Sequence, residues 1–199
     1  MHIVCLDLEG VLVPEIWINV SKTTGIEELK LTTRDISDYD VLMKKRLGIL
    51  KEHSLTLKDI QKVIGTMDPL EGALDFLNQL REKTQVIILS DTFTQFASPL
   101  MKKLGWPTLF CNTLIIDEND AVADYQLRQK DGKKHAVEAL KSLSFSVIAA
   151  GDSYNDVSML KQADAGIFFR PPQTIAKEFP EFPVTTTYDQ LMGEIQKIL

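Results

Sequence analysis

Short apolar runs of strand length recur along the chain and are separated by segments with helical periodicity. The runs cover residues 3–6, 86–89, 109–111, 147–150 and 166–169. They are continuously apolar and do not alternate with polar residues, which is typical of strands buried on both faces of a parallel sheet. Stripes of apolar side chains at helical spacing fall in 71–83, 132–143 and 188–199. Strands that alternate with helices predict an α/β fold, a doubly wound (Rossmann-like) parallel sheet with helices on both sides.

The segment 15–67 interrupts this alternation. It contains no convincing strand and three helical patterns, at 15–24, 38–53 and 57–64, with Ser37 and Thr56 as candidate N-caps of the second and third. We interpret 15–67 as a small helical cap inserted after the first strand, so that 1–14 and 68–199 form the α/β core. Two β-like runs around an acidic turn in 114–122 predict a β-hairpin that projects from the sheet.

The composition argues against nucleic acids and membranes as binding partners and against a disulfide-stabilised fold. The chain of 199 residues carries 28 acidic and 22 basic residues, and this acidic balance argues against nucleic-acid binding, which needs clustered Lys and Arg. No apolar run approaches the roughly 18 residues that span a bilayer, and no basic leader precedes residues 1–6. The only cysteines, Cys5 and Cys111, argue against a disulfide framework. We therefore expect a cytoplasmic protein without nucleic-acid or membrane partners, whose oligomeric state the sequence leaves open.

Polar and acidic side chains follow three of the predicted strands. The set comprises Asp7, Glu9, Ser90, Asp91, Asp152, Asn155 and Asp156. Ligands of open α/β sheets bind beyond the carboxyl ends of the strands, so we expect these groups to share one crevice. Burying unpaired carboxylates costs several kcal/mol, which a hard divalent cation bound between them can offset. Asp91 taken alone could instead be a helix N-cap.

This set of groups suits phosphoryl transfer. A Mg²⁺ ion held by oxygen ligands neutralises phosphate charge, one carboxylate attacks phosphorus, and a second acid protonates the departing alkoxide. A lysine and a hydroxyl can hold the remaining phosphoryl oxygens.

Four motifs in the chain resemble those of the haloacid dehalogenase-type phosphatases, in the same order and at similar spacing. They are DLEGV at 7–11, Ser90, a downstream lysine, and GDSYND at 151–156. The resemblance covers essentially the whole chain and implies a cap over the active site. Within the family the chain looks most like the phosphoserine phosphatases, in particular the bifunctional members that also transfer the phosphoryl group to homoserine.

The resemblance implies roles by position. Asp7 would be the nucleophile that forms an aspartyl-phosphate, and Glu9 the general acid and then the base that activates water. Asp7, Asp152 and the backbone carbonyl of Glu9 would ligate Mg²⁺, with Asp156 supporting the metal site. Ser90 would bind the phosphoryl oxygens.

The lysine motif leaves two candidates for stabilising the phosphoryl charge. Lys133 is favoured over Lys130 because it lies at the start of the predicted 132–143 helix. Most family members have Asp where Glu9 stands, and small residues where Asp91 and Tyr154 stand. These departures favour the bifunctional subtype.

Arg46 lies on the apolar stripe of the predicted 38–53 helix, one turn from Met43 and from Leu50. A guanidinium there must extend to solvent, pair with an acid such as Glu15, or meet an anion. In the last interpretation, which the resemblance supports, Arg46 clamps the substrate carboxylate and Glu15 takes the substrate ammonium. Asp91 and Asn155 would add substrate contacts. Trp17 and Trp106 are expected to pack in the core or under the cap.

The sequence thus predicts a Mg²⁺-dependent phosphoserine phosphatase that works through phospho-Asp7, with water or homoserine as the acceptor. Two alternatives stay open. One is a phosphatase of another small phosphorylated metabolite, such as a sugar phosphate. The other is a receiver-like signalling module with a persistent phospho-Asp, against which the cap and the Glu9 acid argue.

Overall fold

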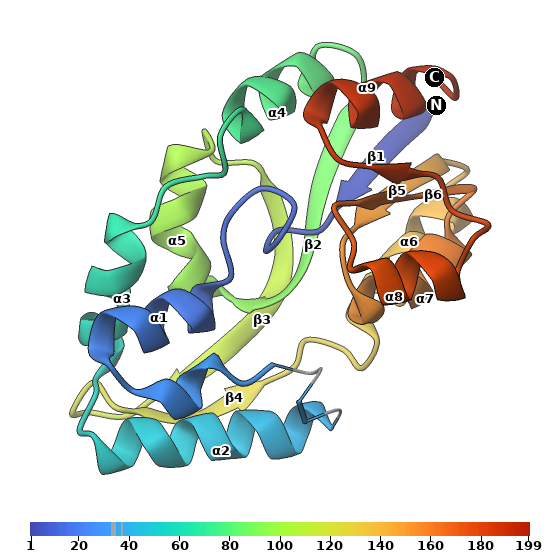
Figure 1. Cartoon of the computed structure of the whole chain (residues 1–199). Helices are drawn as coiled ribbons and strands as arrows, with labels where there is room; N and C mark the ends of the chain where they lie inside the picture. Colours follow the sequence, from blue (N-terminus) through green and yellow to red (C-terminus); the bar gives the residue numbers. More distant parts are fainter. Residues whose placement is uncertain (33–34, 37) are drawn as a thin grey trace.

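One seven-stranded sheet organises the computed structural model, which describes residues 1–32, 35–36 and 38–199. Its order is β4-β3-β2-β1-β5-β6-β7, and all neighbours are parallel except β3 and β4. The strands are β1 (His2–Leu6), β2 (Gln85–Phe93), β3 (Thr108–Ile116), β4 (Val122–Gln126), β5 (Ser146–Gly151), β6 (Ala165–Phe169) and β7 (Val184–Thr185). The prediction of a doubly wound α/β sheet is confirmed (Figure 1).

Helices cover both faces of this sheet. On one face α4 (Ala73–Arg81) and α5 (Thr94–Lys103) contact β2, and α9 (Tyr188–Gln196) contacts β6. On the other face α6 (Gly132–Ser142) and α7 (Val157–Gln162) contact β5. The central strand β1 therefore sends Val4 and Leu6 into one core and Ile3 and Cys5 into the other. Burial on both faces is the physical reason for the continuous apolar run at 3–6. The short helices η2 (Tyr154–Asp156) and α8 (Gln173–Glu178) complete the core.

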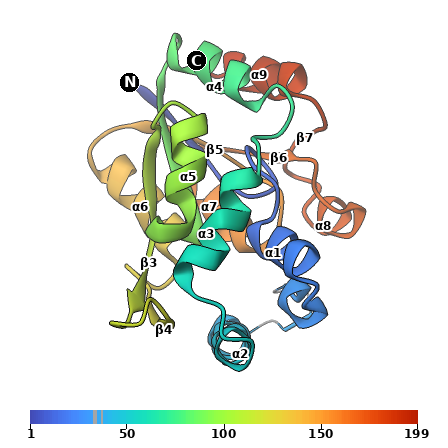
Figure 2. The same cartoon turned by 90° about the vertical axis from the view of Figure 1, so that its left-hand side faces the viewer.

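A helical cap follows β1, as the sequence predicted. It consists of α1 (Ile16–Thr24), the 3₁₀ turn η1 (Glu27–Lys30), α2 (Tyr39–Glu52) and α3 (Leu57–Thr66), with η1 not foreseen. The Thr56 side chain caps α3 in a capping box with Asp59. Asp38 caps α2 by accepting hydrogen bonds from two backbone N–H groups, whereas the candidate cap Ser37 lies outside the described residues. Figure 2 shows α1, α2 and α3 on one side of the sheet, with α2 near β4.

The projecting hairpin is confirmed with different limits. The predicted strand at 109–111 and the first arm of the hairpin form one strand, β3, whose first half pairs with β2 and whose second half pairs with β4. The turn of the hairpin contacts the cap, because the backbone N–H of Leu57 donates to the Asp120 carbonyl (2.8 Å) and that of Lys58 to the Asp120 carboxylate (3.0 Å).

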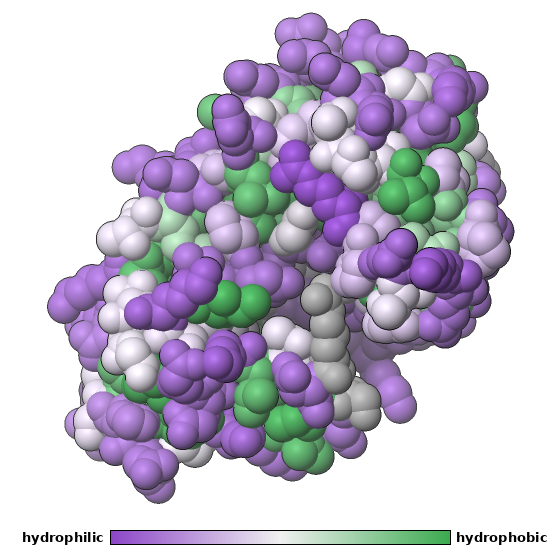
Figure 3. Space-filling view, in the orientation of Figure 1, coloured by the Kyte–Doolittle hydropathy of each residue, from purple (hydrophilic) through white to green (hydrophobic). Residues whose placement is uncertain are grey.

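The surface is mainly hydrophilic on the face drawn in Figure 3, where apolar side chains form small separate patches. None of the helices in the described ranges has the length and apolar character needed to cross a bilayer. Trp17 is buried, as expected, but the prediction for Trp106 is wrong. Its side chain is 65% exposed, at a backbone position with φ = 55° just after α5.

Candidate active site

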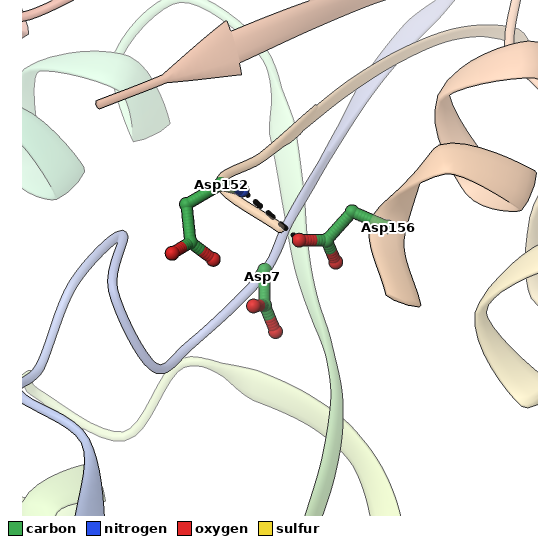
Figure 4. Close-up of side chains that lie close together, drawn as sticks. All are labelled: Asp7, Asp152 and Asp156. Carbon is green, nitrogen blue, oxygen red and sulfur yellow. Dashed lines mark hydrogen bonds between the residues drawn. The ribbon is translucent and has the colours of Figure 1, made fainter. Parts of the chain in front are cut away.

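The ends of β1 and β5 bring three carboxylates together. Leu6 pairs with Ala150 in the parallel register, and the next residue, Asp7, donates its backbone N–H to the Ala150 carbonyl (2.9 Å). Asp152 follows β5 directly. One oxygen from each of Asp7, Asp152 and Asp156 lies within 4.8 Å of the others, and all three side chains are buried (Figure 4). Adjacent parallel strands thus place the acids in one crevice at their carboxyl ends.

Lys133 supplies positive charge to this cluster. It lies in the first turn of α6, is buried, and its Nζ atom contacts Asp7 Oδ1 (2.8 Å) and Asp156 Oδ1 (2.7 Å). Burial lowers the pKa of Lys133, but Asp156 and Asp7 outweigh that effect and hold it well above the usual range. Lys130, the alternative, lines only the outer pocket described below.

The cluster has more acids than one lysine can balance. Burial, reinforced by Asp156, raises the pKa of Asp7 well above its ordinary value, with Lys133 opposing. Burial also raises the pKa of Asp152 to about 7, helped by Asp156 and Glu15. Buried carboxylate oxygens at this separation form a donor set that fits a hard divalent cation. The residues present therefore fit a magnesium site.

Two glycines allow this packing. Gly151 has no room for a side chain, because an added Cβ would lie 2.3 Å from the Asp156 Cγ atom. Asp156 itself is oriented by the backbone N–H groups of Asp152 (3.0 Å) and Ser153 (3.1 Å), which donate to its Oδ2 atom. Gly10 adopts φ = 79°, and a Cβ there would lie 2.5 Å from Asp152 Oδ2.

Glu9 connects the core to the cap. Its Oε2 atom accepts a hydrogen bond from the backbone N–H of Ile16 (2.8 Å), the first residue of α1. Burial, followed by the charge of Glu15, raises the pKa of Glu9 to about 7, while the Ile16 hydrogen bond and the Arg46 charge lower it. A carboxyl group with this pKa holds a proton for much of its time at neutral pH, as a proton donor requires.

The polar residues at the end of β2 contact one another and residues of neighbouring core elements. Ser90 is buried and its Oγ atom accepts from the Thr92 backbone N–H (3.2 Å). Asp91 Oδ2 accepts from Asn155 Nδ2 (2.9 Å) and lies 3.7 Å from Lys133 Nζ. The interpretation of Asp91 as a helix N-cap is wrong, because α5 begins at Thr94 and no side chain caps it.

A pocket of about 380 Å³ lies between these groups and the cap. Asp7, Glu9, Ser90 and Lys133 line its core side, and Glu15, Trp17 and Arg46 line its cap side. A larger outer pocket adjoins it and shares Tyr39, Asp91 and Asn155 with it. The structure therefore gathers all the predicted site residues except Asp156, which lies beneath the pocket, around one cavity or its wall.

Arg46 follows none of the simpler alternatives. It is 7% exposed, so it does not extend to solvent, and no described carboxylate lies within 4 Å of it. Its Nη2 atom donates to the Leu31 carbonyl (2.8 Å), and its guanidinium lies 4.6 Å from the centroid of the Trp17 ring. Sequence reasoning missed this role of Trp17 because a tryptophan at helical spacing looks the same in a core as in a pocket wall.

The chain is similar to known proteins of one family. The family model of the haloacid dehalogenase-like hydrolases matches residues 1–164. A phosphoserine phosphatase of Pseudomonas syringae pv. tomato is 61% identical over 197 residues, covering 99% of this chain and 83% of that protein. The phosphoserine phosphatase ThrH of Pseudomonas aeruginosa is also 61% identical, with coverages of 99% and 96%.

Solved structures support the same fold. A substrate-bound phosphoserine phosphatase complex superposes with a TM-score of 0.78 at 24% identity, over 100% of this chain and 98% of the other. A phospho-aspartyl intermediate analogue of a phosphoserine phosphatase gives a TM-score of 0.77 at the same identity and coverage. With the family model matching most of its length, the chain belongs to the haloacid dehalogenase-like hydrolases.

Proposed function

We propose that this protein is a Mg²⁺-dependent phosphoserine phosphatase that works through an aspartyl-phosphate on Asp7. The observation that carries the proposal is the buried cluster of Asp7, Lys133 and Asp156 beneath a pocket whose cap side presents Arg46 and Glu15. Two relatives at 61% identity that bear the name phosphoserine phosphatase support the choice of substrate.

The reaction assigned to these residues has two steps. In the first, an Asp7 oxygen attacks phosphorus and Glu9 donates a proton to the departing serine oxygen. In the second, Glu9 takes a proton from the water that attacks the aspartyl-phosphate. Ser90 and Lys133 hold the phosphoryl oxygens throughout. Asp7, Asp152 and the Glu9 carbonyl would hold Mg²⁺, with Asp156 supporting them, and the ion would neutralise charge on the phosphoryl group.

The cap residues would select the amino-acid end of the substrate. The buried Arg46 guanidinium suits a carboxylate, and Glu15, at the N-cap position of α1, suits the ammonium group. Asp91 and Asn155, on the pocket wall, would add polar contacts. We assign the cap to 15–67 and the core to 1–14 and 68–199, and we place the enzyme in the cytoplasm.

A second acceptor is included in the proposal. Water releases serine and phosphate, whereas the hydroxyl of homoserine would receive the phosphoryl group from phospho-Asp7. The support for homoserine is the resemblance of the 7–11 and 151–156 motifs and of Asp91 to the bifunctional subtype.

The test is a substrate panel in the presence and absence of Mg²⁺. We expect multiple turnovers of phosphoserine with Mg²⁺, formation of phosphohomoserine when homoserine is added, and no turnover by Asp7→Asn. Stoichiometric labelling without turnover would support a signalling module. Equal turnover of sugar phosphates, unaffected by Arg46→Ala, would support a different metabolite phosphatase.

A further inference from the structure

The surroundings of Arg46 hold its guanidinium in one orientation without neutralising it. Its Cζ atom lies over the Trp17 ring, 4.6 Å from the centroid. Nη2 donates to the Leu31 carbonyl, and Nη1 lies 3.7 Å from the Met43 sulfur. Nε is a buried donor without a partner among the described residues. An aromatic face, a carbonyl and a thioether thus fix the group, while the edge that carries Nε has no anion.

Trp17 is itself anchored to the core. Its ring meets the ring of Phe96 edge to face, with centroids 5.4 Å apart. Trp17 belongs to α1 and Arg46 to α2, both in the cap, whereas Phe96 lies in α5 of the core. The contact series from Phe96 through Trp17 to Arg46 therefore relates the position of the guanidinium to the docking of the cap on the core.

We propose that Trp17 is a positioning residue for recognition of the substrate carboxylate: its ring holds the Arg46 guanidinium in the orientation in which it binds the carboxylate. This inference rests on the proposed function. A flat ring beneath the guanidinium restrains its tilt and leaves only its edge for hydrogen bonding, which suits the planar, bidentate geometry of a carboxylate. An arginine without the ring would sample several tilts, and part of the binding free energy would then be spent on ordering it.

The test compares two substrates that differ by the carboxylate. Phosphoserine has it and phosphoethanolamine lacks it, while both carry the phosphate and the ammonium group. For Trp17→Leu we expect the KM for phosphoserine to rise about ten-fold, which lies between the effects of an exposed and of a fully desolvated cation–π contact, and kcat to change little. The KM for phosphoethanolamine should stay within about two-fold. Trp17→Phe keeps a weaker aromatic face, so its KM for phosphoserine should lie between those of the parent enzyme and of Trp17→Leu.

A double-mutant cycle separates positioning from packing. If Trp17 acts through Arg46, then adding Trp17→Leu to Arg46→Ala should raise the KM for phosphoserine no further. Trp106→Leu, at an exposed site, is the matched control and should leave the KM for both substrates unchanged.

The possible outcomes are distinct. Equal KM rises for both substrates, additive effects in the cycle, or an unchanged KM in both Trp17 variants would overturn the inference. If the parent enzyme does not turn over phosphoserine at all, the proposed function itself is rejected. If Trp17→Leu does not fold, the Trp17→Phe series and its cycle with Arg46→Ala carry the same comparison.

Discussion

The role of Glu9 can be tested by changing the leaving group instead of the pH. An alkoxide needs a proton from the enzyme as it departs, whereas p-nitrophenolate does not. Glu9→Gln should therefore slow phosphorylation of Asp7 by phosphoserine by about 10²–10⁴-fold, the usual contribution of a general acid. The burst of p-nitrophenolate from p-nitrophenyl phosphate should change by less than about ten-fold. Rapid-quench and stopped-flow measurements of the first turnover give both rates, and equal losses would reject the proton-donor role.

Gly10 offers a second test at the scale of a single residue, because the chain contains a matched control. Gly10 and Gly25 have similar positive φ values, 79° and 74°, so alanine should strain both backbones by roughly 1–2 kcal/mol. Only at Gly10 would the new Cβ meet Asp152, since nothing lies within 4 Å at Gly25. Both variants should unfold at a lower temperature, Gly10→Ala by at least as much as Gly25→Ala, but only Gly10→Ala should lose most phosphatase activity and Mg²⁺ affinity. Similar activities in the two variants would show that the close approach of Gly10 to Asp152 is not needed for activity.

Among the elements, the β3–β4 hairpin holds the cap at the start of α3. Asp120 Oδ2 accepts from the Lys58 backbone N–H and so acts as a cap supplied from a distant segment. Asp120→Ala removes this bond and places alanine at φ = 64°, which together should cost about 1–3 kcal/mol. Hydrogen exchange in 57–60 should become faster and the melting temperature lower. Asp124→Ala, at an exposed site on the same hairpin, should change neither the exchange rate nor the melting temperature. Unchanged hydrogen exchange in Asp120→Ala would show that the hairpin does not hold α3.

Elements buried on both faces were predictable, and contacts made between elements were not. The continuous apolar runs identified β1 and β5, and parallel topology then placed Asp7 and Asp152 together. The two-residue strand β7 carries too little pattern to be detected. The sequence predicts two separate strands where the structure has the single strand β3, because the outer half of β3 pairs only with β4 and is half exposed.

Site residues divide in the same way. Acids at strand ends can be found from position alone, because the fold determines where strands end. The roles of Trp17 and of the turn residue Asp120 could not be found in this way. Their partners, Arg46 and Lys58, lie in other elements, and only the packed structure brings them into contact.

For the molecule as a whole, folding gathers more buried acid than it can neutralise, so stability should depend jointly on pH and Mg²⁺. The pKa of Asp152 rises from 3.8 to about 7 in the folded protein, so the folded state binds this proton more tightly than the unfolded chain. The resulting stabilisation is complete below pH 4 and is lost as pH rises through about 7. Mg²⁺ binds the ionised carboxylates and should restore the lost stability.

Thermal melting in EDTA and in Mg²⁺ at pH 5.5 and pH 8 measures this linkage. The increase in melting temperature caused by Mg²⁺ should be larger at pH 8 by at least about 3 °C, roughly what 1 kcal/mol produces in a domain of this size. Asp152→Asn, which removes the charge at nearly constant shape, should melt higher than the parent in EDTA at pH 8 and should gain little from Mg²⁺. An equal Mg²⁺ effect at both pH values would mean that the cation binds elsewhere, since a site made of Asp7 and Asp152 must compete with protons for the same oxygens.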